Sequence, residues 1–128
     1  MKYYFSKSIE MSFDDALNRV VEELKKEGFG ILTQIDVGET LKKKLNVDFR
    51  NYRILGACNP PFAYKALQAE DKIGTMLPCN VVVQETQEGK VDVAAIDPVV
   101  SMQAVDNPGL TEIAVQIQAK LRNVVNNL

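Results

Sequence analysis

Two apolar segments joined by a short polar loop decide the fold: residues 80–96 have the sequence NVVVQETQEGKVDVAAI. Three consecutive valines precede the loop, and apolar residues follow it with a period close to two, which favours a β-strand on each side. The loop, residues 87–90, has the length of a hairpin connection and contains Gly89. The sequence therefore predicts an antiparallel strand pair at this point.

Outward from this hairpin, strands and helices alternate along the chain. Apolar patterns predict further strands at residues 2–9, 29–37 and 52–58. They predict helices at residues 12–28, 60–70 and 107–128, and short helices at 39–45 and 98–102. The order β-α-β-(α)-β-α-β-β-α predicts an α+β fold, with an antiparallel or mixed sheet and helices packed mainly on one face.

Local signals mark the ends of the predicted helices. Ser12 is placed to cap the first helix, and Gly28 is placed to end it in the left-handed conformation that costs glycine little. Each of two later helices is preceded by an asparagine and begins with a proline. The asparagine can cap a free N–H of the helix, and the proline has no N–H that would need a partner. These pairs are Asn59-Pro60 and Asn107-Pro108.

The composition limits the class of protein. The chain has 128 residues, the size of one domain (residues 1–128), and a formal net charge of −2, so we expect no nucleic-acid partner. It contains no run of about 18 apolar residues and no signal-peptide pattern, which predicts a cytoplasmic protein without a membrane span. The absence of histidine removes the commonest general base and the commonest zinc ligand.

The segment before the helix at Pro60 is the candidate site. Cys58 and Asn59 stand just before that helix, whose N-terminal N–H groups and dipole would favour an anion. A second Cys-Asn pair follows Pro78, so the two cysteines could meet at one end of the sheet. The sequence therefore predicts a small polar or anionic ligand. The predicted ligand-binding residues are Gly56, Cys58, Asn59, Pro60, Cys79 and Asn80.

Two alternatives stay open beside ligand binding. In one, the chain is a structural or assembly homodimer module and both cysteines belong to the core. In the other, it is a thiol-based redox protein in which Cys58 is the activated thiolate and Cys79 is its resolving partner. The sequence leaves open whether the protein is an enzyme, and it indicates no cofactor.

Other candidate side chains are weaker. Two cysteines fall short of the four ligands of structural zinc, so no metal site is expected in one chain, although a dimer could pool four thiolates. Asp36, Asp92 and Asp97 are interpreted as turn or capping acids rather than general bases. Aromatic residues that could line an apolar pocket or a dimer interface are Tyr52, Phe62 and Tyr64.

One stretch also carries a resemblance. Residues 52–60 (YRILGACNP) and 77–83 (LPCNVVV), with Ala63, Ala66-Leu67 and Gly74 between them, resemble a prokaryotic family, domain of unknown function three-hundred-and-two. The resemblance spans nearly the whole chain. It implies a TATA-binding-protein-like arrangement, with helices on a curved sheet, and a homodimer. It implies no activity. The family's motif residues correspond to Gly56, Cys58, Asn59, Pro60, Pro78, Cys79 and Asn80.

Overall fold

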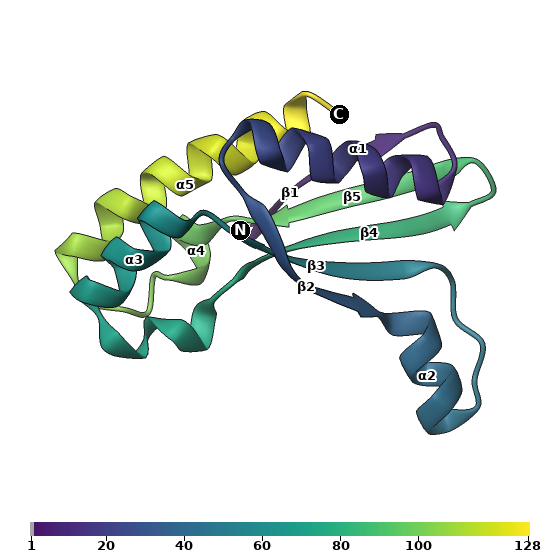
Figure 1. Ribbon diagram of the computed structural model, residues 1–128, viewed down its shortest axis with the longest axis horizontal. Coiled ribbons are helices and arrows are strands. Elements are labelled where there is room, and N and C mark those ends of the chain that lie inside the picture. The colour runs from purple at the N-terminus through teal and green to yellow at the C-terminus, as the bar shows by residue number, and fades with distance from the viewer. Residues whose placement is uncertain (1) are drawn as a thin grey trace.

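Five strands form one sheet in the computed structural model, which describes residues 2–128 (Figure 1). The strands are β1 (Tyr4–Ile9), β2 (Gly30–Asp36), β3 (Tyr52–Cys58), β4 (Cys79–Gln87) and β5 (Lys90–Ile96). They lie in the order β1-β5-β4-β3-β2, and every neighbouring pair is antiparallel. The α+β prediction is confirmed, and of the two predicted sheet types the antiparallel one is correct.

Each predicted helix is present. The helices are α1 (Phe13–Lys26), α2 (Val37–Leu45), α3 (Pro60–Ala69), α4 (Pro98–Ser101) and α5 (Pro108–Asn126). A 3₁₀-helix, η1 (Asp71–Met76), was not predicted, because six residues are too few to show a helical period. Figure 1 shows α1 and α5 along one side of the sheet, α3 and η1 gathered at one end, and α2 at the other.

The core lies between the sheet and helices α1 and α5. Val81 and Val83 of β4, and Val91 and Val93 of β5, point into it because alternate residues of a strand share a face. The apolar stripes of the two helices cover them. These stripes are fully or almost fully buried at Ala16, Val20, Leu24, Leu110, Ala114, Ile117, Leu121 and Val124.

Within residues 2–128, no helix packs over β1, β5 and β4 on the opposite side of the sheet, here called the open face (Figure 1). The open face contains a hollow with a volume of about 470 Å³. Its lining comes from β1, β3, β4, β5 and the residues before β1. The lining residues are Tyr3, Tyr4, Ser6, Tyr52, Asn80, Val82, Gln84, Asp92, Ala94, Ala95 and Ile96.

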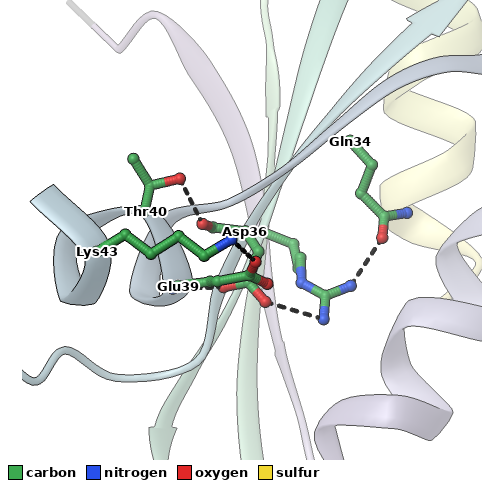
Figure 2. A network of polar contacts seen from close by, with 6 residues as sticks. Gln34, Asp36, Glu39, Thr40 and Lys43 are labelled. Carbon is green, nitrogen blue, oxygen red and sulfur yellow. Dashed lines mark hydrogen bonds and ion pairs between the residues drawn. The ribbon is translucent and has the colours of Figure 1, made fainter.

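Helix α2 is held by polar contacts rather than by core packing, because none of its residues is buried. Figure 2 shows its start: Asp36 accepts from the Glu39 backbone N–H at 3.0 Å, and the Thr40 hydroxyl donates to the Asp36 carbonyl oxygen at 2.9 Å. Lys43 pairs with Glu39 at 2.8 Å. The interpretation of Asp36 as a capping acid is therefore confirmed.

Candidate functional site

A cavity of about 330 Å³ lies at the end of the molecule where β3 ends and β4 begins. Helices α3 and α5, the turn η1 and the segment after α4 complete its wall. The lining is almost entirely apolar and contains no Asp, Glu, Lys or Arg. The lining residues are Phe29, Leu32, Ala57, Cys58, Asn59, Phe62, Ala63, Ala66, Leu67, Gly74, Leu77, Pro78, Cys79, Pro98, Met102, Ile113, Ala114 and Ile117.

Three of the six predicted ligand-binding residues line this cavity, namely Cys58, Asn59 and Cys79. The other three do not. Asn80 is exposed and lines the open face, because it follows Cys79 in a strand and successive side chains point to opposite faces. Both cysteines line the cavity at this end of the sheet, an arrangement that the sequence left open, whereas the two asparagines lie on different faces.

Gly56 shapes the neighbourhood of the cavity without lining it. A Cβ at this position would overlap the Thr33 hydroxyl oxygen and would lie 2.7 Å from Pro78 Cγ. Gly56 is paired with Asn80 across the β3–β4 ladder and with Thr33 across the β2–β3 ladder. Its role is to let the side chains of Thr33 and Pro78 close over the strand.

Asn59 holds two helices together instead of capping one, so the predicted capping role is wrong. Its side chain accepts no hydrogen bond from α3, and its Nδ2 donates to the Glu27 carbonyl oxygen at the end of α1, at 3.1 Å. Gly28 next to Glu27 has φ +86°, as its predicted helix-ending role requires, and a Cβ there would lie 3.0 Å from Asn59 Nδ2. The buried amide is therefore committed to structure.

The N-terminus of α3 is also poorly suited to an anion. Pro60 and Pro61 occupy its first two positions and carry no N–H, so Phe62 is the first residue of the helix that can donate one. At α5, by contrast, Asn107 accepts from the Gly109 N–H at 3.0 Å and caps the helix as predicted. The start of α3 therefore offers an anion fewer N–H groups than a helix without prolines at its first two positions.

The two cysteines are free thiols in different surroundings. Cys58 is half-buried at the strand end and Cys79 is buried. Burial, and secondarily the neighbouring charge of Cys58, raise the pKa of Cys79 to about 11. Cys79 is therefore a neutral thiol at pH 7, and it would need a deprotonating step or a metal to become a thiolate.

Of the remaining candidate residues, Asp97 has a structural role. Asp97 is buried, accepts from the Val99 N–H at 3.0 Å, and receives both hydrogen bonds of the Gln118 amide. It is therefore a capping acid, as predicted. Asp92 is neither a turn nor a capping acid, so that interpretation is wrong: it lies within β5, paired with Gln84, and lines the open face. Of the three aromatic candidates, Phe62 lines the cavity, Tyr64 is exposed, and Tyr52 belongs to the open face.

Sequence comparison decides the family. The family model described as "Domain of unknown function DUF302" matches residues 5–128. The chain belongs to the DUF302 family. A crystal structure of an uncharacterized conserved DUF302 protein from Bacillus stearothermophilus is similar to it, with 30% sequence identity, a TM-score of 0.89, and coverage of 98% of each chain. No curated protein matches the chain.

Five of the residues on which the resemblance was based line hollows on two different faces of the fold. Cys58, Asn59, Pro78 and Cys79 line the cavity, whereas Asn80 lines the open face. Residues contributed by η1 and α5, such as Ile113, were not predicted as site residues, because nothing local in the sequence distinguishes them from ordinary core residues. Within residues 2–128, no helix is long and apolar enough to span a membrane.

Proposed function

We propose that this DUF302 domain binds a small, largely apolar molecule in the cavity beside Cys58 and Cys79. The observation that carries the proposal is the cavity itself. Its volume of about 330 Å³ is at the lower end of the usual range for ligand pockets. The cavity opens to solvent, and its lining residues Leu32 and Leu67 are exposed, so the fold leaves apolar surface unpacked in a concave place, which supports binding of an apolar partner.

The lining supports the class of ligand. Aromatic and aliphatic side chains such as Phe29, Phe62 and Ile117 would contact an apolar ligand. A charged ligand would lose its hydration without gaining an ion pair from any lining residue. The thiols of Cys58 and Cys79 supply weak polar contacts, and one of the two N–H groups of the Asn59 amide is already used by the Glu27 carbonyl oxygen.

A pair of fluorescent probes tests this proposal. N-phenyl-1-naphthylamine is neutral and brightens in apolar surroundings, and its sulfonated analogue differs by one negative charge. We expect saturable binding of the neutral probe, one per chain, and weaker binding of the sulfonated probe. Replacing Ala63 with phenylalanine fills the cavity and should weaken neutral-probe binding by at least about tenfold, or about 1.4 kcal/mol.

The matched control is Ala104→Phe, which makes the same substitution at an exposed position outside the cavity. This variant should bind the neutral probe as the unmodified protein does. Equal binding by the Ala63→Phe protein and the unmodified protein would refute the cavity as the site. If the sulfonated probe binds more tightly than the neutral probe, the result would instead support the anionic ligand predicted from the sequence.

A second candidate function, assembly as a homodimer, rests on the open face. Antiparallel sheets with one solvated face usually carry polar side chains there, yet Val82, Ala94 and Ile96 lie in this hollow beside Tyr52. Asp92 is the one charged residue in the lining, so a second copy would bury little unpaired charge. A twofold dimer would place the same patch on both partners.

Sedimentation equilibrium tests the dimer. We expect the unmodified protein to associate at micromolar concentration and Val82→Lys to sediment as a monomer, because a lysine in the interface would bury an unpaired charge. Val115→Lys, at a 49% exposed position on α5 away from the open face, is the matched control and should still associate. If the unmodified protein is a monomer over the whole concentration range, the homodimer proposal is wrong.

A further inference from the structure

Two lysines lie beside the cavity at Phe62. This phenylalanine of α3 lines the cavity and is half-buried, so part of its ring reaches the rim where the cavity opens to solvent. The ammonium nitrogen of Lys65 lies over the Phe62 ring at 5.6 Å from the ring centroid, and that of Lys120 lies at 5.9 Å. Two positive charges are therefore held next to one aromatic ring of the cavity wall.

The helical repeat explains why both lysines reach this ring. Lys65 follows Phe62 by three residues in α3, and Lys120 follows the lining residue Ile117 by three residues in α5. Residues three apart on a helix are neighbours on its surface, so each lysine lies next to a side chain of the cavity lining. Helices α3 and α5 pack against each other, which brings the two charges to the same part of the rim.

No carboxylate of residues 2–128 forms an ion pair with either lysine. The ion pairs within these residues use other cations, namely Lys26, Lys42, Lys43, Arg53 and Lys72. Lys120 is half-buried, so its charge is also partly withdrawn from water. An anion beside Lys65 and Lys120 would be attracted by both charges and would relieve their mutual repulsion.

We propose that the apolar molecule bound in the cavity carries an anionic head group, which lies at the rim beside Lys65 and Lys120. This inference rests on the proposed function and names its ligand class, an amphipathic anion such as an aliphatic carboxylate. The aliphatic chain would occupy the cavity and gain hydrophobic stabilisation there. The head group would stay in contact with water, so it avoids the cost of burying a charge in a lining without a cation.

The position of the charge within the ligand decides whether this arrangement can form. In an aliphatic carboxylate the charge stands at the end of a flexible chain, so it can remain at the rim while the chain is buried. In the sulfonated naphthylamine the charge is fixed to the aromatic rings and would enter the cavity with them. Weaker binding is therefore still expected for that probe.

Decanoate, decanol and decylammonium test the head group, because they have the same number of carbons and differ in charge. Displacement of N-phenyl-1-naphthylamine, at concentrations below micelle formation, measures their binding. Replacing Lys65 and Lys120 together with glutamine should weaken decanoate binding by about five- to tenfold, since each ion pair at an exposed rim contributes modestly. The same double variant should bind decanol as the unmodified protein does. Lys120→Glu should weaken decanoate binding and strengthen decylammonium binding.

The matched control removes two positive charges elsewhere. Lys44 belongs to α2 and Lys90 to the start of β5, and neither lines the cavity. Figure 1 shows α2 and the β4–β5 hairpin at the other end of the molecule from α3. Replacing Lys44 and Lys90 together with glutamine should leave decanoate binding unchanged.

The outcomes separate the head-group site from the cavity itself. If the Lys65 and Lys120 double variant binds decanoate as tightly as the unmodified protein, the head-group site is wrong. If it loses decanoate and decanol equally, the lysines act by packing on Phe62 rather than by charge, and the site is wrong as well. In both cases displacement of the dye by decanol leaves the apolar-ligand proposal standing. Failure of N-phenyl-1-naphthylamine itself to bind would reject both proposals.

Discussion

Replacing Gly56 with alanine should destabilise the protein by about 1–3 kcal/mol, the usual range for forcing an extra carbon into a well-packed place. The added Cβ would overlap the Thr33 hydroxyl oxygen and would lie 2.7 Å from Pro78 Cγ. The threonine can rotate, but the proline ring is anchored in the chain and must shift. Urea denaturation, followed by circular dichroism, measures the change in the free energy of unfolding.

Two further variants make this test specific. Gly30→Ala introduces the same methyl group into the neighbouring strand, where no atom lies within 4 Å, and should leave stability unchanged or raise it slightly. Thr33→Ala in the Gly56→Ala background should recover part of the loss, because one of the two obstructing groups is removed. If the Gly56→Ala protein is as stable as the Gly30→Ala protein, the side chains of Thr33 and Pro78 do not pack closely over β3 at Gly56.

The second large effect is a loss of stability in alkali that originates at Cys79. Its pKa is raised from 9.0 to about 11 in the folded protein. Between these values the unfolded chain releases a proton that the folded protein retains, so the free energy of unfolding falls as the pH rises. The contribution is fully present below pH 9 and is lost as the pH rises through about 11. Its size is about 2–3 kcal/mol, from 1.36 kcal/mol per pKa unit.

Comparison with Cys79→Ala isolates this effect from the titration of lysines and tyrosines over the same range. Urea unfolding of both proteins at pH 7 to pH 11 gives the difference in the free energy of unfolding at each pH. We expect that difference to shrink by about 2–3 kcal/mol as the pH rises. Parallel curves for the two proteins would mean that the Cys79 thiol is open to water in the folded state.

The secondary structure was predictable from the sequence because its signals are local. β4 carries an apolar run of three valines, the valines of β5 alternate with the pleat, and the apolar stripes of α1 and α5 repeat with the turn of a helix. Caps at Ser12 and Asn107 form over two or three residues. Asn59 shows the limit of such rules, because its hydrogen-bond partner lies 32 residues earlier in the chain.

The candidate site was predictable only in part. That both cysteines reach one end of the sheet follows from their places at the ends of two strands. That Cys79 and Asn80 face opposite sides also follows from strand alternation, because successive side chains of a strand point to opposite faces. The apolar character of the cavity could not be predicted, because Ile113, Ala114 and Ile117 reach it only through the packing of α5.

The strand order has a consequence for synthesis of the chain. β1 is an edge strand whose partner is β5, so Tyr4 pairs with Ile96. As the protein emerges from the ribosome, β1 remains without a partner until the 80 residues between it and β5, and then β5 itself, have been made. Unpaired strands are prone to aggregate. The lysine and serines of β1, Ser6, Lys7 and Ser8, keep this segment polar during that delay, because charged and polar edge residues discourage pairing with other nascent chains.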